Sequence, residues 1–267
     1  MRHWYWLYYL LSSFSSFGAF SNENIVVYTE QFPPYSFYQD GEIKGLNIDL
    51  VKAACHLSKI DCSFELYPWK RAFTMSQTTP NSGLLSTART PSREDLFHWI
   101  GPLVSSPTCF YKLRSRDDIV VETKEDLLNY TVGLPWTDIY EQILTQWGYE
   151  EGKNYITFSE KYAYSRAFKS NKLDLFLASS NTLNEHLTKL NLNVEDVEPI
   201  YLLVDPIFGG NYLALNPQVK PQLVNKLQQR VTMLMNSDEL DTFKEKYITR
   251  IDYKTKNPSP IEKQCQL

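Results

Sequence analysis

Two neighbouring stretches decide the fold: Ile25-Val26-Val27-Tyr28-Thr29 and, after a proline-containing loop, residues 46–58 with the sequence LNIDLVKAACHLS. The first stretch is rich in β-branched residues and predicts a strand. The second spaces its apolar residues at helical intervals, with one face formed by Leu46, Leu50, Val51, Ala54 and Leu57. A strand that leads into a helix is the unit from which α/β folds with parallel strands are built.

The same alternation continues along the chain. Further strands are expected at residues 62–66, 83–86, 130–134, 154–158, 173–177 and 211–215. Helices are expected at residues 69–76, 123–129, 137–147, 161–169, 181–190 and 223–234, and in a last segment after Ser237. The pattern predicts an α/β fold with parallel strands and helices on both faces of the sheets.

The predicted elements fall into two groups, and the extended runs 108–113 and 211–215 connect them. Two strands that link two α/β lobes would form a hinge above a cleft. The expected organisation is lobe 1 at residues 22–110 and 211–253, lobe 2 at 111–210, and a polar C-terminal tail at 254–267. Because ligands of α/β sheets bind at the carboxyl ends of the strands, the loops that face the cleft are the candidate site.

The N-terminus indicates export. Arg2 and His3 precede an apolar, aromatic run that ends at Leu11, and small residues follow at 19–21. This order is typical of a secretory signal peptide, predicted here at residues 1–21, although an uncleaved N-terminal anchor is an alternative. No cysteine follows the apolar run, so the sequence gives no support for a lipid anchor.

Composition narrows the classes of partner. The 267 residues carry a net charge of -4 and show no basic stripe, which argues against a nucleic-acid partner. A monomer is expected, and so is the absence of a cofactor. No zinc site is predicted, because His56, His98 and His186 are far apart in sequence and lack companion ligands. Aromatic residues make up 14% of the chain, which is a high share. Aromatic residues that a core does not need often line a recognition surface.

Export changes the meaning of the four cysteines. In an oxidising compartment, Cys55 and Cys62 are expected to form a disulfide between the end of a helix and the start of a strand. Cys109 and Cys265 can pair if the C-terminal tail folds back over the body. Buried or free thiols are the alternative for both pairs.

Four short motifs occur in order over nearly the whole mature chain. They are Phe32-Pro33-Pro34-Tyr35-Ser36-Phe37, Gly45-Leu46-Asn47-Ile48-Asp49-Leu50, Thr90-Pro91-Ser92-Arg93-Glu94 and Asp241-Thr242-Phe243-Lys244-Glu245-Lys246-Tyr247. In these motifs the chain resembles the extracellular solute-binding proteins of family 3, the periplasmic receptors for amino acids and related polar solutes. The resemblance implies a two-lobed periplasmic-binding-protein type II fold with two hinge strands, a periplasmic location and no chemistry of its own.

Arg93 is the first candidate for the site. It follows Thr90 and Pro91 in a turn, where a guanidinium is able to hold a carboxylate through two parallel hydrogen bonds. The resemblance implies the same role for the arginine of this motif. A surface arginine paired with Glu94 or Asp95 is the alternative, and the nearby Arg89 is a second candidate.

Aromatic residues are expected beside Arg93. The resemblance implies that an aromatic ring of the loop at Phe32 and Tyr35 stacks on the solute, and the hydroxyl of Tyr35 would add a hydrogen bond. Trp69 and Arg71 begin the next predicted helix. Arg71 replaces the family's usual apolar stacking residue, which suits an anionic solute, although a capping role or a salt bridge between the lobes would also explain it.

The second lobe supplies the remaining candidates. Thr137 and the free N–H groups of the helix that follows it are suited to an anion. Trp136 departs from the family's small-residue turn and would limit the volume of the pocket or stack on a flat ligand. Where amino-acid binders of the family carry an aspartate for the α-ammonium group, this chain has Ala178-Ser179-Ser180, so Ser179 is the candidate there.

These features predict a binding protein that closes over a small polar solute, which carries a carboxylate and is an amino acid or an analogue. It would present the solute to an ABC-type importer or a sensor kinase. One alternative is an exported lyase or hydrolase, because Glu30, Asp138 and several serines are candidates to line the cleft. No Ser-His-Asp or Cys-His pattern supports that alternative. A degenerate sensor that no longer binds a solute is the other.

Overall fold

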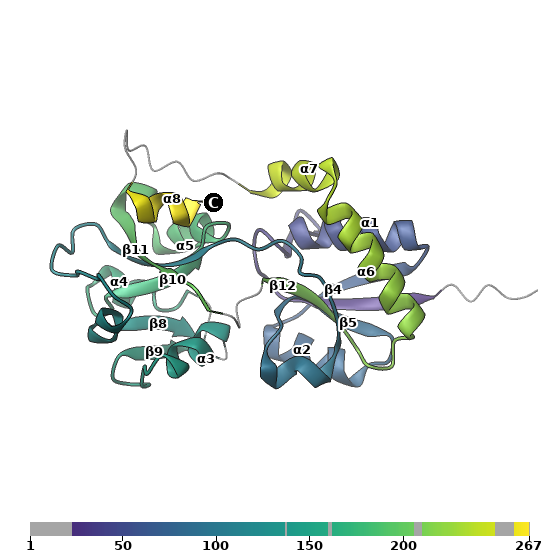
Figure 1. Ribbon diagram of the computed structural model, residues 1–267, viewed down its shortest axis with the longest axis horizontal. Coiled ribbons are helices and arrows are strands. Elements are labelled where there is room, and N and C mark those ends of the chain that lie inside the picture. The colour runs from purple at the N-terminus through teal and green to yellow at the C-terminus, as the bar shows by residue number, and fades with distance from the viewer. Residues whose placement is uncertain (1–22, 137, 160–161, 206–209, 249–258, 267) are drawn as a thin grey trace, which may run out of the picture.

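The computed structural model describes residues 23–136, 138–159, 162–205, 210–248 and 259–266. The predicted signal peptide at residues 1–21 therefore lies outside the described part of the chain. Figure 1 shows two α/β lobes side by side, each built on its own sheet. Within the described residues, no helix is both long and apolar enough to span a bilayer.

The first lobe contains a five-stranded sheet in the order β4-β1-β5-β12-β6. Its strands are β1 (Asn24–Thr29), β4 (Asp61–Leu66), β5 (Ser82–Ala88), β6 (His98–Ile100) and β12 (Asn211–Leu215). Its helices are α1 (Leu46–Ser58), α2 (Trp69–Thr78), α6 (Pro221–Met235), α7 (Asp238–Tyr247) and the short 3₁₀ helix η1 (Pro91–Leu96). A small hairpin, β2 (Phe37–Gln39) and β3 (Glu42–Lys44), precedes α1.

The second lobe contains another five-stranded sheet, in the order β11-β7-β10-β8-β9. Its strands are β7 (Thr108–Leu113), β8 (Val132–Pro135), β9 (Tyr155–Phe158), β10 (Leu175–Ser179) and β11 (Val197–Leu203). Its helices are α3 (Ile139–Gln146), α4 (Ser165–Lys169), α5 (Leu183–Leu190), α8 (Pro260–Gln266) and the 3₁₀ helices η2 (Glu125–Asn129) and η3 (Val194–Asp196).

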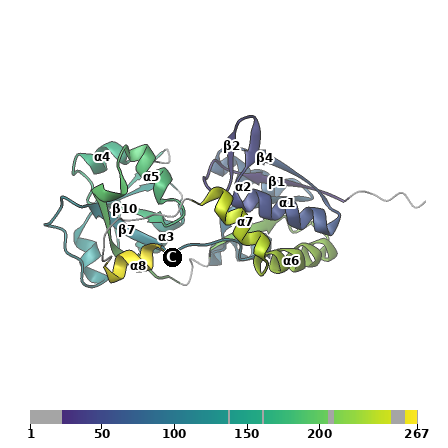
Figure 2. The ribbon, with the colours of Figure 1, turned by 90° about the horizontal axis from the view of Figure 1, so that it is seen from above.

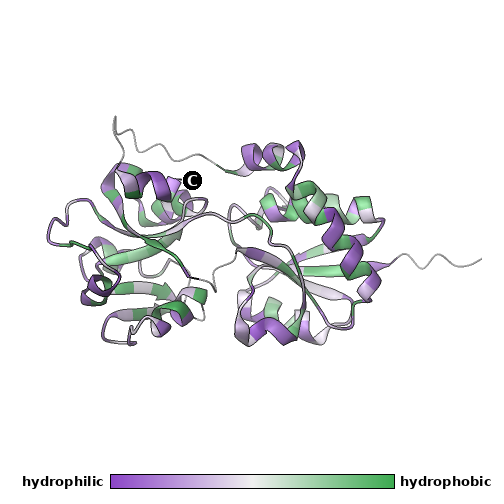
Figure 3. Cartoon of the chain, in the orientation of Figure 1, coloured by the Kyte–Doolittle hydropathy of each residue, from purple (hydrophilic) through white to green (hydrophobic). Residues whose placement is uncertain are grey.

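Alternation along β1 explains why helices cover both faces of the first sheet. Ile25 and Val27 pack into a core shared with α1 and α6, whereas Val26 and Tyr28 pack on the opposite side with α2. Successive side chains of a strand point to opposite faces, so a strand that is apolar on both faces needs a helix on each side. Figure 2 shows α1 and α6 lying next to each other, and Figure 3 shows the apolar strands at the centre of each lobe.

The α/β prediction is confirmed, with differences in detail. β1, β4 and β5 run parallel, as do β8, β9 and β10. β12 is antiparallel to β5, and β7 is antiparallel to β10, because each of these strands enters its sheet from the other lobe. The predicted crossing runs at 108–113 and 211–215 are thus also members of the two sheets. The lobe boundaries themselves stay a prediction.

Several elements differ from the sequence pattern. Strands β6 and β11 were not expected, and the expected helix at 161–169 begins only at Ser165. In α1 the predicted apolar face is buried at Leu46, Leu50, Val51 and Ala54. At the end of the helix, however, Leu57 is 41% exposed and Ser58 is the buried residue. Thr137 lies outside the described residues, and the N-cap of α3 is Asp138, whose side chain accepts a hydrogen bond from the N–H of Tyr140.

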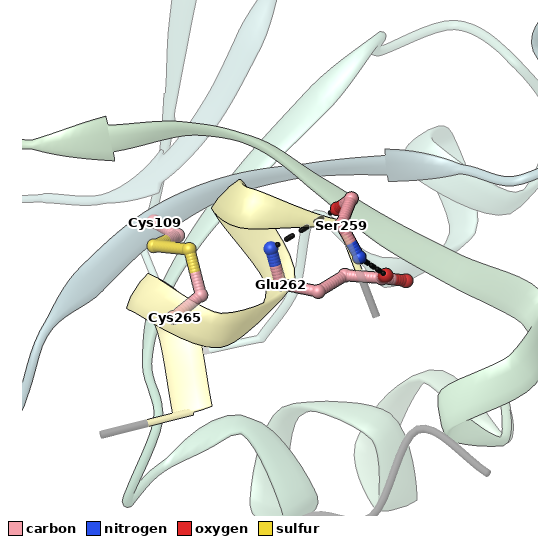
Figure 4. Close-up of a disulfide and its surroundings, with 4 residues drawn as sticks. All are labelled: Cys109, Ser259, Glu262 and Cys265. Atoms are coloured by element: carbon pink, nitrogen blue, oxygen red, sulfur yellow. Dashed lines mark hydrogen bonds between the residues drawn. A yellow bond between two sulfur atoms is a disulfide. The ribbon is translucent and has the colours of Figure 1, made fainter. Parts of the chain in front are cut away.

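The C-terminal tail contains a helix, α8, that packs against β11 of the second lobe. Figure 4 shows the hydrogen bonds that start it: the N–H of Ser259 donates to Glu262 at 2.8 Å, and the N–H of Glu262 donates to Oγ of Ser259 at 3.2 Å. This reciprocal pair is a capping box, and Pro260 occupies the first helical position, where proline is favoured. Glu262 also pairs with Arg114 at 3.5 Å.

The expected pair, Cys55 and Cys62, forms a disulfide, and so does the pair that the sequence left open, Cys109 and Cys265. Cys55 and Cys62 are joined with an S–S distance of 2.07 Å, and Cys109 and Cys265 with one of 2.01 Å. Cys109 lies in β7 and Cys265 in α8, as Figure 4 shows, so the second bond fastens the C-terminal helix to the second sheet. It joins residues 156 positions apart, against 7 for the first bond.

The two disulfides are expected to differ in their effect on stability. In the chain-entropy model, a bond over the longer loop contributes about 5 kcal/mol and one over the shorter loop about 2.5 kcal/mol. The double variant Cys109→Ser/Cys265→Ser should therefore melt at a lower temperature than Cys55→Ser/Cys62→Ser. Circular dichroism of both variants in non-reducing buffer measures this, and a lower melting temperature for the short-loop variant would contradict the expectation.

Candidate functional site

A cavity of about 710 Å³ is lined by residues of both lobes. The first lobe contributes residues at the carboxyl ends of β1, β4 and β5, and the second lobe contributes residues at the carboxyl ends of β8, β9 and β10. Carboxyl ends of parallel strands are where α/β folds bind ligands, because backbone groups and loop side chains point outward there. The volume falls in the range usual for small-molecule sites.

Arg93 lies on the cavity wall of the first lobe, in η1. Its Nη1 donates to Oγ1 of Thr87 at 3.4 Å and to the carbonyl of Ala88 at 3.3 Å, both at the end of β5. The guanidinium carbon lies 5.3 Å from the ring centre of Trp69 and 5.5 Å from that of Phe73. These contacts hold a cation in place at the cavity, on aromatic rings that attract it.

The guanidinium of Arg93 is partly buried, and this burial removes some of its hydration. Burial lowers the pKa of the Arg93 guanidinium, and the charge of Asp138 in the second lobe opposes that shift. An arginine side chain remains protonated despite such a change. Because burial removes water from the guanidinium, a carboxylate that reaches it would replace lost hydration with strong, charge-assisted hydrogen bonds.

The loop that carries Phe32 and Tyr35 is held by the start of α1. The N–H of Leu46 donates to the carbonyl of Pro34 at 2.9 Å, and that of Asn47 to the carbonyl of Tyr35 at 3.0 Å. Gly45 is required between them, since its φ is +137° and an added Cβ would lie 2.4 Å from the carbonyl oxygen of Tyr35. The first two family-like motifs are therefore one packed unit.

Phe32 and Tyr35 both line the cavity, and their ring centres are 5.1 Å apart. Tyr35 is 2% exposed, and its hydroxyl lies 3.4 Å from Oγ of Ser106. The same hydroxyl accepts a hydrogen bond from Nδ2 of Asn181 at 3.2 Å. Tyr35 thus connects a loop of the first lobe with the chain between the lobes and with a loop of the second lobe.

On the second lobe, Trp136 follows β8 and lines the cavity with its side chain 61% exposed. Its backbone N–H donates to the carbonyl of Phe158 at 2.9 Å, which continues the pairing of β8 with β9. The backbone is thus fixed, while much of the indole ring remains open to solvent. Such a ring offers apolar area that a bound solute would cover.

Ser179 lines the cavity at the end of β10 and is buried. Its backbone N–H donates to Oγ1 of Thr182 at 3.1 Å, and its hydroxyl lies 3.0 Å from the same oxygen. The end of β10 therefore presents a neutral hydroxyl that already takes part in a turn.

Arg71 and Arg89 are not among the residues that line the cavity. Arg71 is exposed and stacks 4.3 Å from the ring centre of Tyr67. Nε of Arg89 donates to Glu94 at 2.7 Å, which is the surface pairing that had been the alternative for Arg93. Of the two arginines near the turn, Arg93 is the one that the structure places at the cavity.

The sequence did not predict two tyrosines and a histidine that the second lobe contributes to the cavity wall. Tyr140, Tyr164 and His186 line the cavity, and the hydroxyl of Tyr164 lies 2.6 Å from Nδ1 of His186. Burial is the main cause that raises the pKa values of Tyr140 and Tyr164. Both hydroxyls therefore stay protonated near neutral pH. Tyr164 and His186 are 22 residues apart, and no local pattern links them.

Within the described residues, no three His, Cys, Asp or Glu side chains gather as metal ligands would. The charged side chains at the cavity are Glu30 and Lys70 of the first lobe, Asp138 of the second, and Arg93. Together with the aromatic rings and hydroxyls, this set is suited to hold a small polar molecule through ion pairs, hydrogen bonds and stacking.

The chain is similar to several solved structures. A histidine kinase sensor domain similar to periplasmic binding proteins aligns with a TM-score of 0.70 at 18% identity, covering 85% of this chain and 96% of that one. A Salmonella typhimurium periplasmic binding protein described for its high arginine specificity gives 0.66 at 19%, covering 85% and 100%. The second substrate-binding domain of a putative amino acid ABC transporter from Streptococcus pneumoniae gives 0.59 at 16%, also covering 85% and 100%.

These likenesses show the fold, which is the type II fold of periplasmic binding proteins. No curated protein matched the sequence. The family model of the bacterial extracellular solute-binding proteins, family 3, matches residues 25–250. That match covers most of the chain, including both sheets and all the residues named above at the cavity. The chain belongs to family 3 of the bacterial extracellular solute-binding proteins.

Proposed function

We propose that this protein is exported to the periplasm, binds a small polar solute that carries a carboxylate, and presents it to a membrane partner. The observation that carries the proposal is the placement of Arg93. Its guanidinium lies on the cavity wall with neutral oxygen atoms of Thr87 and Ala88 as its hydrogen-bond acceptors. A guanidinium held in this way at a cavity can bind a carboxylate through two parallel hydrogen bonds.

The division of the cavity between two lobes supports a binding cycle. Arg93 and Trp69 approach the solute from the first lobe, and Trp136 and Ser179 from the second. A solute that contacts both lobes favours the arrangement in which they are close together, because its affinity for that arrangement is higher. The membrane partner would then recognise the closed form. An ABC-type importer and a sensor kinase are the two proposed partners, since structures of similar fold come from both contexts.

A thermal-shift experiment tests the proposed function. The protein would be melted with each of a panel of amino acids and small carboxylates, since a ligand at 100 times its Kd stabilises by about 2.7 kcal/mol. A rise in melting temperature with some member of the panel is the expected result. Absence of a shift with every member would contradict the proposal and favour a degenerate sensor, whereas consumption of a bound member would favour the exported-enzyme alternative.

Arg93→Ala should remove the ligand-dependent shift, because a charge-assisted contact contributes about 1.5–3 kcal/mol, roughly tenfold to 150-fold in Kd. The melting temperature without ligand should hardly change, since the contacts of Arg93 with Thr87 and Ala88 are long. Calorimetric titration and melting curves measure both quantities.

Arg89→Ala is the matched control for that variant. It removes an arginine four positions away that pairs with Glu94 outside the cavity, and it should leave affinity unchanged. Arg93→Lys should also bind weakly, because an ammonium lacks the planar fork of a guanidinium. If Arg93→Ala bound the solute as tightly as the unaltered protein, Arg93 would have no place in the site.

Trp136→Ala should widen the range of solutes that give a thermal shift, because it enlarges the cavity on the second lobe. Stability without ligand should change by less than about 0.5 kcal/mol, since the ring is 61% exposed. Tyr38→Ala, which removes a ring that is 58% exposed on β2, serves as the control and should leave the range unchanged. A large fall in unliganded stability for Trp136→Ala would instead mark the ring as a packing residue.

A further inference from the structure

Tyr35 of the first lobe is hydrogen-bonded directly to Asn181 of the second, beside the chain that crosses between the lobes. Nδ2 of Asn181 donates to the hydroxyl of Tyr35 at 3.2 Å, and the same hydroxyl lies 3.4 Å from Oγ of Ser106 in the crossing. We propose that this interlobe bridge, formed by Tyr35, Ser106 and Asn181, holds the lobes together and sets how readily the protein closes. The inference goes beyond the proposed function, because it concerns the lobes themselves.

The first half of the crossing is fixed to the first lobe. The N–H of Gly101 donates to Oε1 of Gln228 in α6 at 2.9 Å. Asn211 of β12 holds the next residues: its carbonyl accepts from the N–H of Leu103 at 2.7 Å, and its Nδ2 donates to the carbonyl of Val104 at 3.3 Å. Residues 101–104 are therefore expected to move with the first lobe.

The second half of the crossing is fixed to the turn that follows β10 in the second lobe. The N–H of Ser180 donates to the carbonyl of Pro107 at 2.9 Å, and the N–H of Asn181 donates to Oγ of Ser106 at 3.3 Å. Ser105 is exposed and lies between the two sets of anchors. Because a hinge is a short segment that absorbs the change in backbone angles, rotation at this crossing is expected at Ser105.

Tyr35 reaches across that pivot. It belongs to the first lobe, whereas Ser106 and Asn181 are anchored to the second. Tyr35, Ser105 and Ser106 all line the cavity, so the interlobe bridge lies on the cavity side of the crossing. Opening of the lobes widens this side and separates Tyr35 from Asn181. The bridge therefore favours the arrangement in which the lobes are close together.

Burial makes these hydrogen bonds important for Tyr35. The residue is 2% exposed, so little water reaches its hydroxyl. Burial raises the pKa of Tyr35, and hydrogen bonds with Ser106, Asn181 and Ser179 oppose that rise. The hydroxyl is therefore neutral near neutral pH and is able to accept from Asn181 while it donates its proton to Ser106. A buried hydroxyl that lost these partners would be left unsatisfied, which is unfavourable.

Tyr35→Phe tests the interlobe bridge, because it removes the hydroxyl and keeps the ring that packs 5.1 Å from that of Phe32. The ratio of closed to open molecules should fall roughly twofold to twelvefold, the range that one neutral hydrogen bond gives. Small-angle X-ray scattering of the purified protein without solute measures this change. The radius of gyration of Tyr35→Phe should exceed that of the unaltered protein.

Tyr149→Phe is the matched control. Tyr149 is also 2% exposed, and its hydroxyl donates to the carbonyl of Leu127 at 2.7 Å within the second lobe. The variant thus loses a buried hydroxyl and its hydrogen bond without touching the space between the lobes. Its radius of gyration should equal that of the unaltered protein.

Asn181→Ala removes the interlobe bridge from the other lobe and should also open the protein. It replaces Tyr35→Phe in the test if that variant does not fold. The double variant Tyr35→Phe/Asn181→Ala should be no more open than Tyr35→Phe alone, since both changes remove the same hydrogen bond.

A second measurement separates the interlobe bridge from a contact between Tyr35 and the solute. The bridge acts on the lobes before a solute binds, so its loss reduces the fraction of molecules that are ready to close. Calorimetric titration of Tyr35→Phe should therefore show the same fold-loss of affinity for every amino acid or small carboxylate that the unaltered protein binds. A loss confined to some of these solutes would place the hydroxyl on the solute and overturn the inference.

Three scattering results would also overturn it. The first is a radius of gyration of Tyr35→Phe that equals or falls below that of the unaltered protein. The second is an equal expansion of Tyr149→Phe, which would indicate general loosening of the fold. The third is a double variant in which the effects of the single changes add. Because the scattering experiment uses no solute, failure of every solute to bind would refute the proposed function and leave this inference standing.

Discussion

The central strands of both sheets are buried on both faces, and this constraint decides where the protein is able to bind a solute. Val27 packs towards α1 and α6, Tyr28 packs towards α2, and the strands of the second lobe alternate in the same way. Side chains along the strands are therefore committed to packing. Only the strand ends and the loops that follow them remain for recognition, and in both lobes the carboxyl ends border one cavity.

Those parts of the fold that repeat a local pattern could be predicted from the sequence. β1 and α1 follow from period-2 and period-3.6 spacing, because their apolar faces are continuous. Strand β6 has three residues and β11 contains Pro199, so neither shows a readable period. Helix α8 was not predicted, because the residues around it are mostly polar and show no apolar helical period. The capping box of Ser259 and Glu262 is the one signal in the sequence that could have indicated it.

The site was only partly accessible from the sequence, for a physical reason. Arg89 and Arg93 have the same chemistry, and only the path of the η1 turn directs one to Glu94 and the other to the cavity. Tyr164 and His186 come together because α4 and α5 pack on the same side of β10. Contacts that depend on the packing of distant elements leave no trace in local spacing. The positions of the ligand-facing loops, in contrast, follow directly from where strands end.

The cavity combines fixed charges with neutral hydroxyls, and the two serve different purposes. Arg93 and Asp138 lie on opposite lobes. Tyr140 and Tyr164 carry neutral hydroxyls, whose pKa values burial raises further above the usual value for tyrosine. Neutral hydroxyls both donate and accept hydrogen bonds, so under the proposed function they would adapt to different solutes, while Arg93 would hold the carboxylate.

The bond between Cys109 and Cys265 closes the chain between these two residues into a covalent ring. The ring begins at Cys109 in β7 and includes the rest of the second lobe's strands and helices as far as Cys265 in α8. It also includes β12, α6 and α7 of the first lobe. A mechanical force applied to the two chain ends would be transmitted through the disulfide. The residues between Cys109 and Cys265 would therefore not be stretched. Because the bond spans 156 positions, roughly 500–560 Å of extended chain would stay shielded from the pull until the bond is reduced. While the bond is intact, the second lobe would therefore keep its fold at a tension that unfolds β1 and α1, which lie outside the loop.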